Sequence, residues 1–320
     1  MSATTLPSTN LLENLKFKEF IEAFTDILKE SEKLSLDETR KLCTNFFLPS
    51  DTIYEPVEKV TNIEITGRDG HKIPLRIFNP SELKDLPIIL YFHRGGWVFG
   101  SIKEADPVCR KIANHFGAIV IAVEYRLCPE HPFPKPLNDC YDATAWAFKN
   151  SNYFEGSKEN LIVCGESCGG NLAAAVALMA RDEQGPSISA QLLINPMITS
   201  CIKDSSYNNS VDRYFITKDS MKFFWSIYLQ GSDGENPYAS PNFASNLTNL
   251  PPALIITAEY DPLHLEAQEY AQKLQDANVK VLFKCFPEVI HSFIDLPIYE
   301  EEQKIAWIQE IGNLLKNFIQ

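Results

Sequence analysis

Residues 161–182 read LIVCGESCGGNLAAAVALMARD, and this stretch decides the fold that the sequence predicts. Its first six residues form a short apolar run and its last thirteen are typical of a helix, so we expect a sharp turn from strand to helix at Ser167. Gly165 and Gly169 stand two positions before and after the serine, where a larger side chain would clash. The turn would expose the Ser167 hydroxyl at a helix N-terminus, whose dipole favours a developing negative charge. A glycine-serine loop that only caps a helix is the alternative, and the flanking strand and helix disfavour it.

Short apolar runs on both sides of this turn predict the rest of the sheet. Most of them are separated by segments of the size of a crossover helix, which indicates an α/β fold with a parallel sheet buried on both faces. Two earlier strands around a turn at Gly70 form an antiparallel pair, so we expect a mostly parallel sheet of eight strands flanked by helices. The six apolar runs are LPIILYF (86–92), AIVIAVEY (118–125), LIVCGE (161–166), AQLLIN (190–195), ALIITAE (253–259) and VKVLFKCF (279–286).

Two further segments predict a helical cap on this sheet. Residues 10–48 carry apolar residues at helical spacing with charges between them, which is typical of two amphipathic helices. A long insertion at about 197–240 contains its own amphipathic piece, TKDSMKFFWSIYL. We therefore expect N-terminal cap helices in residues 1–50 and one α/β domain over residues 51–320 with the insertion as a second part of the cap.

The composition excludes several classes of partner. The chain has 320 residues, enough for one large or two ordinary domains, and its net charge of −13 repels polyphosphate, so we expect no nucleic-acid partner. No stretch approaches the roughly 20 uncharged apolar residues of a membrane span, and the N-terminus lacks the pattern of a secretory signal. The eight cysteines lack metal-ligand spacing, which favours reduced thiols. We expect a cytoplasmic protein without stable membrane insertion, metal or other cofactor.

A second glycine motif, HRGGW at residues 93–97, follows the apolar run 86–92. Acyl transfer passes through a tetrahedral oxyanion that backbone N–H groups must stabilise, and Gly95 and Gly96 let a loop approach such a group closely. A simple glycine turn after a strand is the alternative. The position of the loop, one strand before the pair that carries Ser167, favours the oxyanion role.

Asp261 and His291 complete a candidate catalytic set with Ser167. A serine nucleophile needs a base, and the base needs a carboxylate that fixes its tautomer. Asp261 ends the run ALIITAEY, and His291 follows VKVLFKCF after a loop, so both are expected at the carboxyl ends of parallel strands, where active sites of such sheets lie. His264 is a rival base, but its place at a helix start is expected to direct it away from the serine.

The chain resembles the hormone-sensitive-lipase-like family of α/β-hydrolase esterases, from about residue 57 to residue 295. The resemblance implies the α/β-hydrolase fold and hydrolysis of short- to medium-chain acyl esters through an acyl-enzyme. It implies Ser167 as nucleophile, His291 as base, Asp261 as its orienting carboxylate, and the N–H groups of Gly95, Gly96 and Cys168 as the oxyanion hole. The resemblance also implies a small-molecule acyl ester as substrate and a monomer or homodimer, which family members often form. The matching stretches are HRGGWVFGS, EYRLCPEHPFP, GESCGGNLAA, TAEYDPLHLEA and VIHSF.

Two residues depart from the family pattern near the expected site. Arg94 replaces the first glycine of H-G-G-G, and it would be strained if that position needs a positive φ. Arg94 narrows the alcohol or acyl side of the pocket, favours an anionic substrate, or points to solvent, and we name it with Trp97 and Phe224 as a pocket candidate. Cys168 replaces the usual alanine, either as a buried structural thiol or as an oxidisable one.

Two other functions remain open from the sequence. The same triad hydrolyses amides in small-molecule deacetylases, and the sequence does not separate the two substrates. A hydrolase-fold protein that only binds its ligand is the second alternative, although the candidate base His291 is intact.

Overall fold

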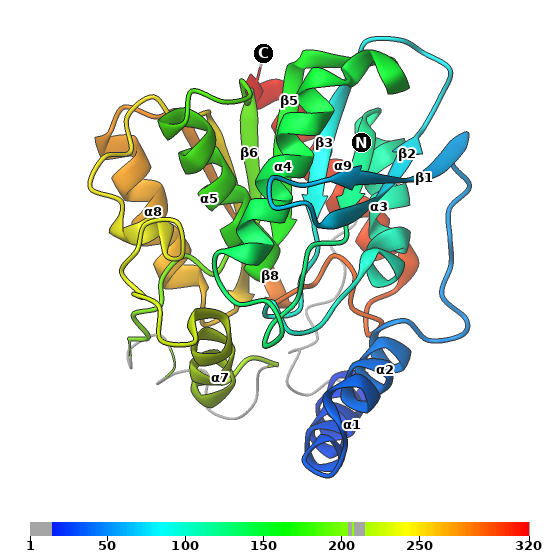
Figure 1. Cartoon of the computed structure of the whole chain (residues 1–320). Helices are drawn as coiled ribbons and strands as arrows, with labels where there is room; N and C mark the ends of the chain where they lie inside the picture. Colours follow the sequence, from blue (N-terminus) through cyan, green and yellow to red (C-terminus); the bar gives the residue numbers. More distant parts are fainter. Residues whose placement is uncertain (1–14, 204–206, 208–214, 320) are drawn as a thin grey trace.

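The core of the computed structural model, which describes residues 15–203, 207 and 215–319, is an eight-stranded sheet (Figure 1). The strands lie in the order β1-β2-β4-β3-β5-β6-β7-β8. The pairs β1–β2 and β2–β4 are antiparallel, and all other neighbours are parallel. The prediction of a mostly parallel eight-stranded sheet is confirmed. The strands are β1 (Lys59–Thr66), β2 (Lys72–Asn79), β3 (Leu86–Phe92), β4 (Ile119–Val123), β5 (Gly156–Glu166), β6 (Ala190–Ile194), β7 (Ala253–Tyr260) and β8 (Val281–Ile290).

Helices bury both faces of the sheet, as the unbroken apolar runs of its central strands require. Helices α3 (Ile102–Phe116) and α9 (Glu301–Ile319) pack on one face and form one core. Helices α4 (Lys135–Lys149), α5 (Cys168–Asp182) and α8 (His264–Asp276) pack on the other and form a larger core. Within the described residues, no helix combines the length and the apolar character that crossing a bilayer demands.

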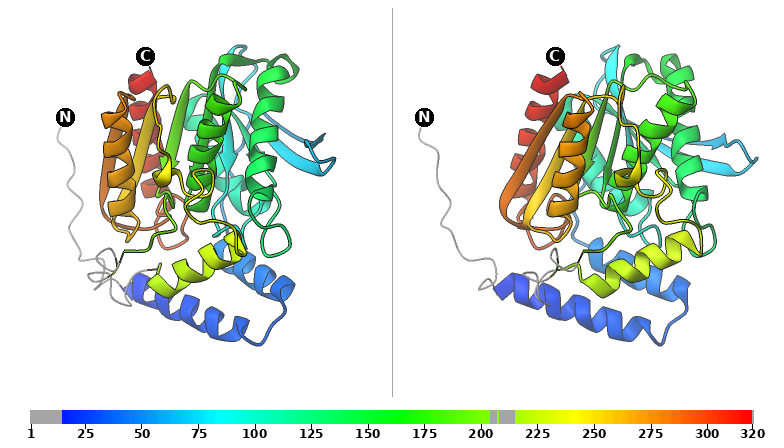
Figure 2. Two further views of the ribbon diagram at one scale, coloured as in Figure 1. Left: turned by 60° about the vertical axis from the view of Figure 1, so that its left-hand side comes forward. Right: turned by 90° about the vertical axis from the view of Figure 1, so that its left-hand side faces the viewer.

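Three more helices lie together beyond the carboxyl ends of the strands (Figure 2). They are α1 (Leu15–Ser31), α2 (Leu36–Phe47), which begins with a capping box at Ser35, and α7 (Lys218–Leu229). The two helices predicted in residues 10–48 are therefore confirmed where the chain is described. The parts of the expected cap at 1–14, 204–206 and 208–214 lie outside the described residues.

Aromatic rings join these helices to the sheet. Phe215 lies 4.8 Å from Phe24 of α1 and 5.8 Å from Phe47 of α2, measured between ring centroids. Trp225 and Tyr228 of α7 pack on the indole of Trp97, which follows β3. Ring packing thus holds α7 on Trp97 and links α1 and α2 to Phe215. Arg40 of α2 adds polar contacts, because it donates hydrogen bonds to the carbonyls of Val98 and Cys128 at 3.0 and 2.9 Å.

Strand β8 is longer at its carboxyl end than the sequence predicts. The predicted run stops at Phe286 and continues as a loop, whereas β8 runs on to Ile290 after a register shift against β7. Val289 and Ile290 are buried, which favours the longer strand. Pro287 is tolerated because β8 lies at the edge of the sheet. His291 consequently follows the strand directly.

Candidate active site

The turn between β5 and α5 holds Ser167 in a strained backbone conformation. Its φ is 57° and its ψ is −120°, which few residues other than glycine adopt. A Cβ on Gly165 would lie 2.1 Å from the carbonyl oxygen of Gly169, and one on Gly169 would lie 2.0 Å from that of Phe92. Both glycines are therefore needed for the chain to pass, and the serine is set at the N-terminus of α5 as predicted.

His291 and Asp261 form a short polar contact beside this turn. His291 Nδ1 lies 2.7 Å from Asp261 Oδ2, and both side chains are buried. Because an ionised carboxylate only accepts hydrogen bonds, Nδ1 carries the proton and Nε2 is left to accept one. His264 does not join them: its Nδ1 lies 2.9 Å from Thr257 Oγ1 at the start of α8.

The sequence patterns do not point to Asn195, which nevertheless belongs to this site. Asn195 follows β6 and donates a hydrogen bond from Nδ2 to Asp261 Oδ2 at 2.7 Å. The backbone N–H of Leu263 donates to the other carboxylate oxygen at 2.9 Å. Asp261 thus accepts three hydrogen bonds, which fix its orientation toward His291. A polar residue directly after a buried strand of the parallel sheet was the available signal, because strand ends gather at one edge.

Ser167 and His291 line one cavity of about 140 Å³ together with Gly95 and Gly96. The two glycines have φ values of 125° and 60°. A Cβ on Gly96 would lie 2.2 Å from the ring of Phe224, so the loop and α7 meet at this glycine. The remaining wall is mostly apolar and comes largely from α1, α2, α7 and the chain beside them. Its apolar residues include Phe24, Ile27, Leu28, Phe47, Phe215 and Ile216.

Cys168 holds the end of the glycine loop, residues 93–97, through a hydrogen bond. Its side chain is buried, and its Sγ accepts a hydrogen bond from the backbone N–H of Trp97 at 3.3 Å. Burial raises the pKa of the Cys168 thiol to about 11, so it stays protonated at neutral pH and the oxidisable alternative loses support. Trp97 was a pocket candidate, but its ring is fully buried against α7, where it stacks on Tyr228 at 3.9 Å. Trp97 is not part of the cavity wall, unlike Arg94 and Phe224.

Arg94 does not point to solvent, and its backbone is not strained. Its φ lies outside the left-handed region that Gly95 and Gly96 occupy. The side chain is 12% exposed, and its Nε donates to both carboxylate oxygens of Asp295, at 2.9 and 3.0 Å. The expectation of a solvent-facing side chain is wrong because a carboxylate from a distant part of the chain meets the guanidinium inside the protein.

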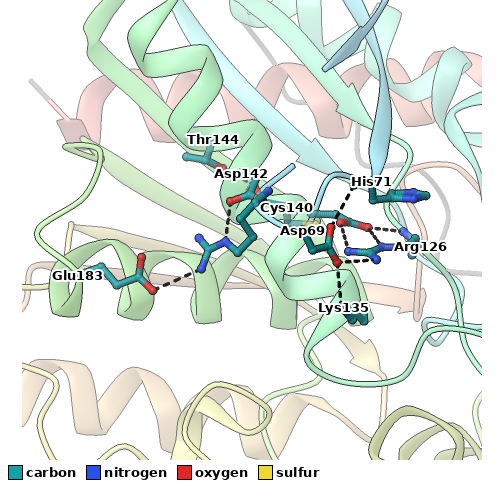
Figure 3. A network of polar contacts seen from close by, with 10 residues as sticks. Asp69, His71, Arg126, Lys135, Cys140, Asp142, Thr144 and Glu183 are labelled. Atoms are coloured by element: carbon teal, nitrogen blue, oxygen red, sulfur yellow. Dashed lines mark hydrogen bonds and ion pairs between the residues drawn. The ribbon is translucent and has the colours of Figure 1, made fainter. Parts of the chain in front are cut away.

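A polar network supports the loop from behind β4. Tyr125 donates a hydrogen bond to the carbonyl of His93 at 2.7 Å and stacks on its imidazole. The next residue, Arg126, forms ion pairs with Asp139 at 2.7 Å and Asp69 at 2.9 Å. Figure 3 shows Asp69 between Arg126 and Lys135. The network ties the chain behind the glycine loop to α4 and to the β1–β2 turn.

The chain resembles proteins of one enzymatic class. Residues 89–295 match the family described as having the alpha/beta hydrolase fold. An arylesterase of Saccharolobus solfataricus is 32% identical over 82% of this chain and 85% of that protein. The carboxylesterase NlhH of Mycobacterium tuberculosis is 35% identical over 72% of this chain and 75% of that protein. Among solved structures, an esterase of Pyrobaculum calidifontis has 37% identity and a TM-score of 0.83, with coverage of 89% of this chain and 93% of the other.

Proposed function

Because the chain belongs to the α/β-hydrolase family and is a carboxylic ester hydrolase, we propose that Ser167, His291 and Asp261 are its catalytic triad. The observation that carries the proposal is the buried 2.7 Å contact between His291 and Asp261, with His291 in the wall of the same cavity as the strained Ser167. This arrangement fits a serine nucleophile with a base and an orienting carboxylate.

The reaction follows from the roles of these groups. His291 Nε2 takes the proton of Ser167 as Oγ attacks the ester carbonyl carbon, and the N–H groups of Gly95, Gly96 and Cys168 stabilise the oxyanion. The bond to the alcohol oxygen then breaks, and the alcohol leaves with the proton of His291. Water repeats the same steps on the acyl-enzyme and releases the acid.

The wall of the cavity suggests the substrate class. We propose that α1, α2 and α7 form a cap, within residues 1–50 and about 197–240, on a catalytic domain that spans residues 51–320. The rings and aliphatic chains that they place around the cavity favour short- to medium-chain acyl or aromatic esters without charge.

Replacing the nucleophile tests the proposal. In Ser167→Ala, kcat for p-nitrophenyl butyrate is expected to fall about 10⁴-fold or more, because the attacking oxygen is gone. Ser31→Ala removes another hydroxyl from the cavity wall and is expected to stay within about 3-fold of the wild type. A fluorophosphonate should label the wild type and not Ser167→Ala. Turnover by Ser167→Ala within 10-fold of the wild type would refute the triad, and faster cleavage of the matching anilide than of the ester would reassign the substrate to an amide.

The composition of the chain supports a cytoplasmic location and the absence of a nucleic-acid partner. All eight cysteines are free thiols, which suits the reducing cytoplasm, and the net charge of −13 disfavours nucleic acid as a partner. We therefore infer a cytoplasmic enzyme, and from the family resemblance we propose that it works as a monomer or homodimer. Light scattering after size exclusion measures that state directly.

A further inference from the structure

Arg94 meets three segments that carry catalytic groups. It precedes Gly95 in the glycine loop, and its ion-pair partner Asp295 lies four residues after His291. Its Nε also lies 4.0 Å from Oε2 of Glu166, the residue before Ser167. The Arg94 side chain thus links the glycine loop to the segment that follows His291 and to the segment that precedes Ser167.

The ion pair between Arg94 and Asp295 is short and mostly buried, as a positioning contact requires. Nε lies at nearly equal distances from the two carboxylate oxygens, and the two side chains are only 12% and 13% exposed. The guanidinium carbon of Arg94 also lies 4.5 Å from the ring centroid of Phe47 at the end of α2. An arginine held by a carboxylate and an aromatic ring has little freedom to move.

The charge of Arg94 is already offset by the protein. Asp295 and Glu166 face it, and Glu104 lines a small cavity with Arg94 and Asp295. The Asp295 carboxylate pairs directly with the guanidinium, whereas burial raises the pKa of Glu166 and of Glu104 and favours their neutral forms. This surrounding argues against the charge-selection role that the sequence left open for Arg94.

The glycine loop needs such an anchor. Gly95 and Gly96 both have positive φ, and glycine restricts the backbone less than any other residue. Cys168 Sγ holds the far end of the loop through the N–H of Trp97, while the near end begins at Arg94. We propose that Arg94 is a positioning residue whose ion pair with Asp295 fixes the oxyanion loop relative to His291. This inference rests on the proposed function, because it assigns the oxyanion to that loop.

Arg94→Gly, which restores the family's glycine, tests the proposal. We expect kcat to fall about 10- to 100-fold with KM within about 3-fold, equally for neutral and anionic short-chain esters, because displaced donors stabilise the oxyanion less. Arg94→Lys keeps the charge and should recover part of the loss. Asp295→Asn should resemble Arg94→Gly, and the double variant should fall no further than either single one.

A transition-state mimic separates positioning from mere stability. Ser167 adds to a trifluoromethyl ketone with transfer of its proton to His291, which leaves a hemiketal oxyanion in the hole. The affinity for this ketone should fall in Arg94→Gly by the same factor as kcat/KM. As a control, Arg76→Ala breaks the Arg76–Asp106 pair between β2 and α3, outside the cavity wall, and should lower the melting temperature without changing this affinity.

Three outcomes would overturn the inference. They are an unchanged kcat in Arg94→Gly, a KM increase confined to anionic esters, and losses that multiply in the double variant. If Arg94→Gly does not fold, Arg94→Lys and Asp295→Asn decide by the same readouts. A result in which Ser167→Ala is inactive while Arg94→Gly keeps its kcat removes only the role of Arg94. Turnover by Ser167→Ala instead removes the proposed function.

Discussion

The floor of the cavity and the cap above it are held together by different interactions. The floor, which comprises the proposed triad and the loop 93–97, rests on strand ends, glycines without room for a Cβ, and polar contacts such as the three on Asp261. The proposed cap, α1, α2 and α7, rests on ring packing around Phe215 and Trp97, together with the polar contacts of Arg40 in α2. Polar geometry fails when one atom changes, whereas apolar packing tolerates changes of volume. We therefore expect kcat to depend on single polar atoms in the floor, and the preference for acyl-chain length to depend on side-chain volume in the proposed cap.

The largest effect should follow from a change of one atom in the floor. Asp261→Asn replaces a carboxylate oxygen with an amide nitrogen that cannot accept the proton of His291 Nδ1. We expect kcat to fall about 10⁴-fold with little change in fold, because the imidazole is left in the wrong tautomer. Asn195→Ala removes one of the three contacts on Asp261 and should cost about 10-fold. Steady-state kinetics on p-nitrophenyl butyrate measure both, and equal losses would contradict the graded sensitivity.

An intermediate effect is expected at Glu266, where the floor meets the cap insertion. Its Oε1 accepts the N–H of Ile198 at 2.7 Å, and burial raises the pKa of Glu266 from about 4.5 to about 8. The folded state thus holds a proton that the unfolded state releases, so the free energy of unfolding falls as the pH rises from 4.5 to 8. Because the side chain is partly exposed, we expect this loss to be on the order of 1 kcal/mol.

Urea unfolding at pH 6 and pH 9 measures this loss. Glu266→Gln keeps an acceptor for Ile198 without a titrating proton and should lose less stability than the wild type over that interval. Glu269→Gln changes an exposed carboxyl on the same helix, and this variant should lose as much stability between pH 6 and pH 9 as the wild type. If Glu266→Gln loses as much stability between pH 6 and pH 9 as the wild type, groups other than Glu266 cause the pH dependence.

The smallest effect is expected from a change of volume in the cap. Phe224→Ala removes the ring that faces Gly96 and should raise kcat/KM for octanoate relative to acetate esters about 4-fold, because the cavity gains length there. The neighbouring Phe223 is largely exposed, so Phe223→Ala should leave the ratio within about 2-fold. An unchanged ratio in Phe224→Ala would place the acyl chain elsewhere.

The sequence predicts the arrangement of the floor better than that of the proposed cap, because the floor depends on patterns of residues that are close together in the chain. A strand, a turn and a helix around Ser167 need glycine at 165 and 169, and these requirements act within a few residues. The order of strands then brings Asp261 and His291 to the same edge. Each of these inferences uses neighbours in the chain or the general rule for parallel sheets.

The rest depends on side chains that meet from distant parts of the chain. Arg94 and Asp295 are 201 residues apart, and no spacing rule connects them. Trp97 has the character of a pocket residue, but α7 covers it. The apolar run ends at Phe286, whereas β8 continues to Ile290 through Pro287, which is tolerated at an edge that only the topology reveals.

The distribution of the eight thiols has a practical consequence. Six of them are buried, Cys285 is intermediate, and Cys201 alone is exposed. Cys201 lies early in the insertion that includes α7, so a maleimide dye should attach there without reaching Cys168 beneath the glycine loop. The wild-type chain thus offers a natural attachment point for a fluorescent reporter of cap movement during turnover.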